Sequence, residues 1–331
     1  MDNELEDKWK RRILNQQFPL IGSNLPGEGN GYHDRVSFDL NYNQSTNSDD
    51  RYNHWVYFVY FRDLINSFDP ELRQRFHENV NFDLINCSEN YRDTFKRYIA
   101  GQKYHYQGEI LDAFSTLLKL LIQHGRIILE FVSWFDNETS DVYGFELKIL
   151  PFKNTIIRNK NVQFEGIDRD GTTRKVKIPK NKCIVIDWPK KLGGYKGFSE
   201  TINKVLSLGP KTPPISDVAT LNPGTILARN KKWEEEFNRL LAKWGLTSVP
   251  NDLTEFYKEY NNLKIRSTGI LCIEAILVGL NQVVQKLNIV LGEQASLVET
   301  SDFYCSVKHE KITQQWLNGT ISFTTANSHL R

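Results

Sequence analysis

The stretch that most constrains the fold runs from 110 to 199, where a helix, a glycine and a series of strands follow one another with short connections. Apolar residues recur at three- and four-residue spacing over 110–124, which indicates a helix with one buried face. Gly125 supplies the left-handed backbone conformation that readily ends a helix, and His124 before it is interpreted as a cation that offsets the helix dipole. The β-branched and aromatic run over 126–135 then predicts a buried strand.

Further strands are predicted in the same stretch. After a polar turn, a second strand runs from Tyr143 to Leu150 and stops at Pro151. A glycine-rich loop over 190–199 opens another helix. The shorter strands are predicted at 154–158, 162–167, 173–178 and 183–189. Helices combined with a small β-sheet in this order predict an α+β fold.

The order of these elements resembles the α+β wing core of the portal proteins of tailed bacteriophages. In that family a helix ends in a glycine and leads into a strand and a G-x-x-x-L-x-x-L-x-P turn. Gly125 and the segment 144–151, which is two residues shorter than that motif, resemble these features. The family's later Y-G-[LF]-S segment, which follows a hydrophobic strand, is similar to 195–199 after 184–187, with Lys196 inserted between the tyrosine and the glycine. These motifs are structural and carry no chemistry of their own.

The resemblance implies a ring of about a dozen copies at one vertex of the capsid, through which double-stranded DNA is packaged and ejected. Its implied partners are other copies of itself, the terminase, a neck adaptor and the major capsid protein. It further implies a place in the virion after synthesis in the cytoplasm of a bacterial host, and no catalysis by the ring.

Two departures from the family keep other functions open. The chain is short for a portal, and 209–265 predicts helices where the family usually has a β-rich clip between two stem helices. One alternative is a DNA-binding or DNA-cleaving module, for example in antiphage defence. The other is a neck or adaptor protein of a phage.

Composition divides the chain into four parts. Residues 1–50 are rich in glycine and polar residues, so we expect an extended arm. Residues 51–208 are expected to form the α+β wing-like core, with helices over 51–108. A proline-rich linker is predicted over 209–224. Residues 225–331 predict a helical region that resembles a stem or clip.

Several helices are expected in this last part. One carries apolar residues over 233–244 before a closing glycine, and another starts at Asp252 with the pattern of a capping box. The longest, 270–291, has an apolar seam with alternating steps of four and three residues, so we expect it to pack lengthwise on another helix. A strand over 297–307 and a short helix over 310–317 complete the prediction.

Length and composition exclude several classes of protein. A chain of 331 residues with 40% hydrophobic and 25% charged residues indicates a folded protein of roughly two domains. No run approaches the roughly 18 apolar residues of a membrane-spanning helix, and the acidic start resembles no signal peptide, so we expect neither. The four cysteines lie outside metal-ligand spacing and predict free thiols in a reducing compartment, with those at 183 and 272 in the core.

No catalytic, cofactor or metal motif is found in the sequence, so we predict a protein that is not an enzyme and holds no cofactor. The glycine-rich loop over 193–197 is better interpreted as a tight turn than as a phosphate cradle. Glu165, Asp168, Lys175 and Lys177 offer the residue types of a Mg²⁺-dependent nuclease. However, the D-R-D-G sequence among them is typical of a hairpin turn, which we favour.

A local excess of positive charge lies over 153–196. Twelve Lys and Arg residues face four Asp and Glu residues there, within a chain of net charge +2. Such a surface fits DNA phosphates or an acidic patch on the next subunit, and edge-strand lysines that prevent aggregation are the third interpretation. The possible DNA or subunit contacts are Arg174, Lys175, Lys177, Lys180, Lys182, Lys190, Lys191 and Lys196.

Overall fold

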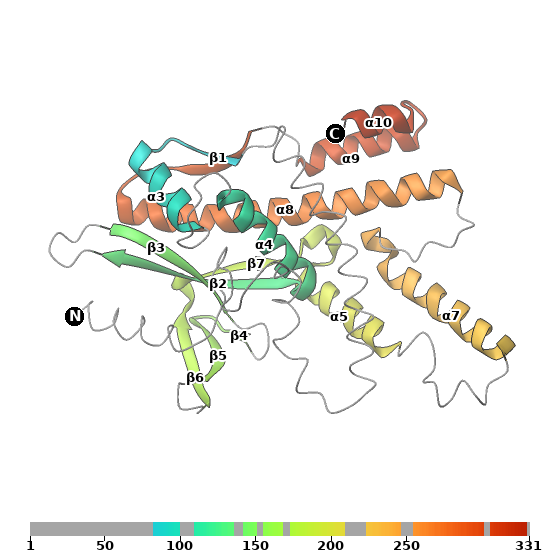
Figure 1. The fold of residues 1–331 in the computed structure, drawn as a ribbon, viewed down its shortest axis with the longest axis horizontal. Helices are drawn as coiled ribbons and strands as arrows, with labels where there is room; N and C mark the ends of the chain where they lie inside the picture. The colour runs from blue at the N-terminus through green and yellow to red at the C-terminus, as the bar shows by residue number, and fades with distance from the viewer. Residues whose placement is uncertain are drawn as a thin grey trace, which may run out of the picture. The chain divides into compact units, whose positions relative to one another are not determined.

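The computed structural model describes residues 82–99, 109–135, 142–150, 155–167, 173–208, 223–245, 254–300 and 305–329. These residues form an α+β fold with a mainly helical C-terminal part, as the sequence predicts (Figure 1). They divide into two compact units, which are described separately: unit 1 holds 82–187 and 275–300, and unit 2 holds 188–274 and 305–329. The arm over 1–50 and the helices over 51–81 lie outside the described residues, so these expectations stay predictions, as do the domain boundaries.

A helix and a three-stranded sheet form the centre of unit 1. Helix α4 (Glu109–His124) ends at Gly125, whose φ of 67° is left-handed, and strand β2 (Arg126–Phe135) begins at the next residue. β2 pairs antiparallel with β3 (Val142–Ile149) on one side and with β7 (Cys183–Asp187) on the other. The prediction of a helix, a glycine and a hairpin is therefore confirmed.

The short strands form a sheet of their own, in the order β4–β5–β6 (Figure 1). β4 (Ile156–Ile157) pairs with β5 (Asn161–Ile167), which pairs with β6 (Thr173–Pro179), all antiparallel. One face of this sheet packs on the first sheet through a hydrophobic cluster that comprises Ile128, Leu150, Val162, Phe164, Val176, Ile178 and Cys183. The expectation of one small sheet is therefore wrong: the strands are divided between separate sheets.

A third, two-stranded sheet joins distant parts of unit 1. β1 (Phe82–Ile85) pairs antiparallel with β8 (Ser296–Glu299). β1 lies in a segment for which the sequence predicts helices, and its strand conformation depends on a partner more than 200 residues away. Within the segment 51–108, the expectation of helices is confirmed for α3 (Glu89–Ile99). β8 is shorter than the strand predicted over 297–307, because helix α9 (Ser306–Leu317) has already begun at residue 306.

One long helix, α8 (Glu255–Leu291), replaces the two that the sequence predicts. It continues without a break between the two predicted helices and contributes residues to both units. The Thr268 hydroxyl donates a hydrogen bond to the carbonyl of Trp244, 3.1 Å away, so this polar residue is satisfied inside the helix. The helix begins at Glu255, later than the predicted start at Asp252, which lies outside the described residues. The Thr254 carbonyl accepts hydrogen bonds from the N–H groups of Tyr257 and Lys258.

The apolar seam of α8 is buried within its own chain. Leu280 has no exposed surface, and Gly279 beside it packs directly on Ile186 of β7. The hydroxyl of Tyr91 in α3 donates a hydrogen bond to the carbonyl of Val284, 3.1 Å away. In unit 1 the seam therefore meets a strand and a short helix, whereas the sequence predicted lengthwise packing on another helix.

Two asparagines of α8 hold strand β8 in place. The side-chain amide of Asn281 donates to the carbonyl of Leu297 at 2.8 Å and accepts from its N–H at 2.9 Å. Asn288, two turns later, makes the same pair of bonds to Ala295 at 2.9 and 3.1 Å. The asparagines thus satisfy backbone groups that a neighbouring strand would otherwise bond.

Unit 2 is built from helices. α5 (Gly194–Ser207) begins inside the loop predicted over 190–199, directly after the 3₁₀ turn η4 (Lys190–Leu192). α7 (Pro223–Leu241) begins ten residues before the expected apolar run, with proline at the first helical position. It takes up the last two residues of the predicted linker, whose other residues lie outside the described ranges. A further helix after α9, α10 (Phe323–His329), was not predicted.

An aromatic core joins the helices of unit 2. The rings of Trp188, Phe198 and Trp244 lie 4.9 to 5.5 Å apart, and all three side chains are buried. Trp244 closes the helix predicted over 233–244, and Gly245 ends it with a φ of 78°. Aromatic pairs at such distances stabilise a core beyond the area that they bury.

In the described part of the chain, α8 is long and apolar enough to cross a membrane, with a mean hydropathy of 1.6 over its best window. However, 56% of that window is buried inside the protein. A core helix has the same length and composition, so the expected absence of a membrane span stays a prediction.

The contact between α8 and β7 yields a stability prediction. A Cβ on Gly279 would lie within 2.6 Å of Cδ1 of Ile186, so we expect Gly279→Ala to lower the free energy of unfolding by about 1–3 kcal/mol. Gly197 in α5 is the matched control, since a Cβ there meets nothing within 4 Å. Gly197→Ala should leave stability unchanged or raise it by up to about 1 kcal/mol. Urea denaturation measures both, and equal stability of the two variants would contradict the close packing.

Candidate functional site

Four positive side chains gather at one end of the sheet β4–β5–β6. Arg158 and Lys160 lie in the turn between β4 and β5, and Lys180 and Lys182 lie in the 3₁₀ turn η3 (Lys180–Lys182) after β6. All four are exposed. The N–H of Lys180 donates to the carbonyl of Lys160 at 3.0 Å, so the two turns lie against each other. We call these four residues the basic turn cluster.

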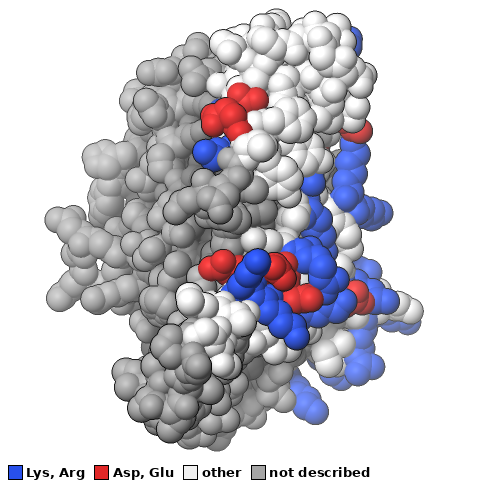
Figure 2. Space-filling model, turned by 90° about the vertical axis from the view of Figure 1, so that its right-hand side faces the viewer, with Lys and Arg blue, Asp and Glu red and all other residues white. Residues whose placement is uncertain are grey.

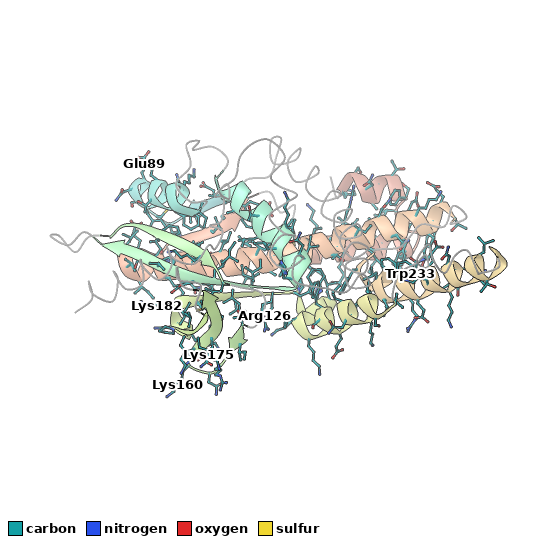
Figure 3. The ribbon with its side chains drawn as sticks, turned by 60° about the horizontal axis from the view of Figure 1, so that its bottom comes forward. Glu89, Arg126, Lys160, Lys175, Lys182 and Trp233 are labelled. Atoms are coloured by element: carbon teal, nitrogen blue, oxygen red, sulfur yellow. The ribbon has the colours of Figure 1, made fainter. Side chains whose placement is uncertain are left out.

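The outer face of the same sheet extends this positive charge. Lys175 and Lys177 of β6 are exposed, whereas the alternating Val176 and Ile178 are buried in the hydrophobic cluster. Two lysines of one strand two residues apart point to the same side of a sheet. Figure 3 shows Lys160, Lys175 and Lys182 around this sheet.

A lysine of α8 holds the turn η3 in place. The ammonium group of Lys286 donates a hydrogen bond to the carbonyl of Asn181, in the middle of η3. Lys286 is half-buried, and desolvation lowers the pKa of its ammonium group. The turn that presents Lys180 and Lys182 is therefore fixed from the helix side as well as by the sheet.

The structure separates the contacts that the sequence suggested. Lys175, Lys177, Lys180 and Lys182 lie together in unit 1, as does Arg174, whose side chain is not among those described. The others lie in unit 2: Lys190 and Lys191 in η4 and Lys196 in α5.

Two of the unit 2 lysines have acidic partners. Lys191 pairs with Glu310 at 3.2 Å, and Lys196 pairs with Glu200 at 3.9 Å. Figure 2 likewise shows Lys and Arg side chains with acidic side chains among them on the face that it presents. These lysines are therefore weaker candidates for a ligand contact than those of unit 1.

Sequence reasoning did not select Arg158 and Lys160, which the structure places beside η3. Their signal was available in the sequence, because Arg158 is the last residue of the strand predicted at 154–158 and Lys160 lies between that strand and the one predicted at 162–167. What the sequence does not give is the hydrogen bond between the two turns, which brings residues 20 positions apart together.

The other chemical candidates are not supported as catalytic sites. Glu165 pairs in register with Lys175 as a cross-strand neighbour, and Asp168 lies outside the described residues. Among the residues that the structure describes, no group of three His, Cys, Asp or Glu side chains is placed to hold a metal ion. The nuclease hypothesis therefore gains no support from the described residues.

The glycine-rich loop before α5 forms a tight turn, as favoured from the sequence. Gly193 and Gly194 both have a left-handed φ, of 101° and 62°. Their N–H groups donate to the carbonyls of Lys190 and Pro189, each at 3.0 Å. Backbone donors that are already bonded within the turn cannot also cradle a phosphate.

The two buried cysteines, Cys183 and Cys272, are not reactive thiols. All four cysteines of the chain are free. Burial raises the pKa of the Cys183 thiol to about 12, and burial also raises the pKa of Cys272. Both thiols are protonated at neutral pH and pack as small core residues, as the sequence predicts.

A pair of buried charges crosses the central sheet of unit 1. Glu130 of β2 and Lys148 of β3 are partners in the strand register and are only 2% and 5% exposed. Cys183 of β7 lies opposite Glu130 on its other side. Opposite charges on neighbouring strands favour one register over its slipped alternatives, so we assign this row a structural role.

The histidines also differ from the sequence interpretation. Burial lowers the pKa of His124 to about 4, so its imidazole is neutral at pH 7 and does not offset the dipole of α4 as a cation. His309 of α9 is buried in unit 2, and burial, followed by the nearby Arg266, lowers its pKa to about 4. Its Nδ1 lies 3.4 Å from the Thr313 hydroxyl.

Comparison with known proteins adds no assignment. A scan against models of protein families finds no match. A search of curated proteins likewise finds no significant relative. The functional argument therefore depends on the residues and geometry described above.

The buried His309 generates a pH prediction. Its pKa is lower in the folded state than the usual value of about 6.5, so the unfolded state binds the proton more readily. The stability that the neutral imidazole contributes is complete above pH 6.5 and is lost as the pH falls toward 4. Replacing it with the non-titrating glutamine, His309→Gln, should reduce the loss of stability between these pH values.

Chemical denaturation at several pH values measures this effect. His329→Gln, which changes an exposed histidine in α10, is the control and should keep the wild-type pH dependence. If His309→Gln shows the same acid destabilisation as wild type, the assignment to His309 is wrong.

Proposed function

We propose that this chain is a structural subunit of a ring, of the kind that tailed bacteriophages place as a portal at one capsid vertex. The observation that carries the proposal is the sequence of paired elements from α4 through Gly125 and the β2–β3 hairpin to the β5–β6 hairpin, β7 and α5. These are the elements on which the resemblance to the portal wing core depends. The proposal includes no catalytic step.

A second observation supports contact with other copies. Val278 and Ile289 of α8 are 62% and 85% exposed. They are 11 residues apart, which places them on nearly the same side of the helix. Single exposed apolar residues are common, but two on one side of a long helix suit packing against a neighbouring subunit.

The remaining parts of the proposal follow from the resemblance. Double-stranded DNA would pass through the ring, and the terminase, a neck adaptor and the major capsid protein would bind it. The protein would be made in the bacterial cytoplasm and reside in the virion.

The basic turn cluster favours a second candidate, a DNA-binding module. The two are separable, because a dedicated DNA-binding module would bind DNA tightly as a monomer, whereas a portal surrounds DNA without gripping it. A neck adaptor would also form a ring, and we favour it less because the helix, glycine and hairpin of unit 1 resemble a portal core.

A substitution on the exposed side of α8 tests the proposal. Wild-type protein should form particles of about twelve times 38.6 kDa. Ile289→Asp places a charge in the proposed contact, so we expect particles of lower mass in mass photometry. Leu280 is unsuitable for this test because it is buried within its own chain.

The matched control adds the same charge elsewhere on α8. Asn262 is an exposed residue of α8 that lies outside unit 1 and the proposed contact, so Asn262→Asp should keep the wild-type mass. Monomeric wild-type protein, or rings that persist with Ile289→Asp, would count against the proposed contact.

A further inference from the structure

We infer that the basic turn cluster, together with Lys175 and Lys177, contacts the phosphate backbone of double-stranded DNA without reading its sequence. This inference goes beyond the proposed ring, because the surface lies within a single chain. A monomer and a ring subunit would both present it.

The two turns of the basic turn cluster carry positive charge only. The turns 158–161 and 179–182 contain two positive residues each and no acidic residue. Within the part of the chain that the structure describes, the side chains of Arg158, Lys160 and Lys180 form no ion pair. Several cations elsewhere do have acidic partners, among them the half-buried Arg126 with Asp187 and the exposed Arg239 with Glu236. Phosphates would supply the missing negative charge.

The backbone of the two turns is held in place by contacts on several sides. The backbone bond from Lys180 to Lys160 joins the two turns, and the bond from Lys286 to Asn181 fixes η3 on α8. The opposite face of the sheet is anchored in the hydrophobic cluster. The lysines therefore project from fixed backbone positions, which lowers the entropy that a contact must overcome.

The residue composition of this surface favours DNA over a protein as its partner. Centres of protein interfaces are enriched in aromatic residues and depleted of lysine, whereas this surface is lysine-rich. The exposed large apolar side chain on the described part of its outer face is Ile156, which is 53% exposed. A protein partner would find little to bury here, and lysines suit phosphate contacts.

The same surface favours duplex DNA over single strands and backbone contact over base recognition. Single-strand binding uses exposed aromatic platforms, and Phe164 of β5 is buried on the inner face. Amide side chains can read adenine, but the amide of Gln163 donates to Asn161 at 2.9 Å and is already engaged. A few phosphate contacts without base readout predict a Kd on the order of 10⁻⁴ to 10⁻⁶ M.

The test measures binding of full-length protein to a labelled duplex of mixed sequence, by fluorescence anisotropy in a salt titration. With about four phosphate contacts, wild-type affinity should fall by about two orders of magnitude between about 50 and 200 mM salt. The variant R158Q/K160Q/K180Q/K182Q should bind at least about tenfold more weakly at low salt and have a shallower salt slope, by about 0.9 for each lost contact.

Two controls separate this surface from general charge effects. The variant K231Q/K232Q/K308Q/K311Q removes the same charge from exposed lysines of α7 and α9 in unit 2, and should bind like wild type. The variant K160R/K180R/K182R keeps the charge and should also bind like wild type. Unchanged thermal melting shows that each variant is folded.

Two results would overturn the inference. One is equal loss of affinity in the two quadruple glutamine variants, which would assign binding to net charge alone. The other is wild-type DNA affinity in R158Q/K160Q/K180Q/K182Q, and a lower particle mass in that variant would then assign the surface to a subunit contact. Particle mass of the wild type tests the ring separately, so failure of either proposal is recognised independently.

Discussion

The continuity of α8 is the constraint on which the rest of the structure depends. Its buried seam meets β7 through the contact of Gly279 with Ile186, and two of its asparagines, Asn281 and Asn288, bond β8 and the residue before it. Because β8 pairs with β1, the helix also fixes a strand from the other end of the described chain. In unit 2 the first part of the same helix supplies Thr268 to the aromatic core. Disruption of α8 would therefore affect both units.

The central sheet and α8 fix the geometry of the basic turn cluster. The strands β5 and β6 are short, and an isolated hairpin of this size is only marginally stable in water. Their inner face is buried against the central sheet, and Lys286 of α8 holds the turn that follows β6. The cations are thus presented by a rigid edge of unit 1. Lysines on an edge strand also oppose aggregation, so one arrangement serves both solubility and the proposed contact.

Local sequence patterns predicted the helices and hairpins that depend on local interactions. Helix α4, its end at Gly125 and the β2–β3 hairpin follow from apolar spacing and a single glycine. Strand β1 could not be predicted this way, because it depends on pairing with β8. The two helices predicted from Asp252 and over 270–291 are one continuous helix, Glu255–Leu291, because packing along its whole length outweighs weak local helix propensity. The lysines of β6 and η3 were found from composition, whereas Arg158 and Lys160 required the contact between two turns.

The central claim is that this chain forms a ring, and electron microscopy of the purified protein tests it most directly. Averaged images should show closed rings with rotational symmetry and a central channel wide enough for duplex DNA. Compact particles without a channel, from protein at concentrations where all copies are assembled, would contradict the claim. In that event the basic surface of unit 1 would make a DNA-binding module the better account.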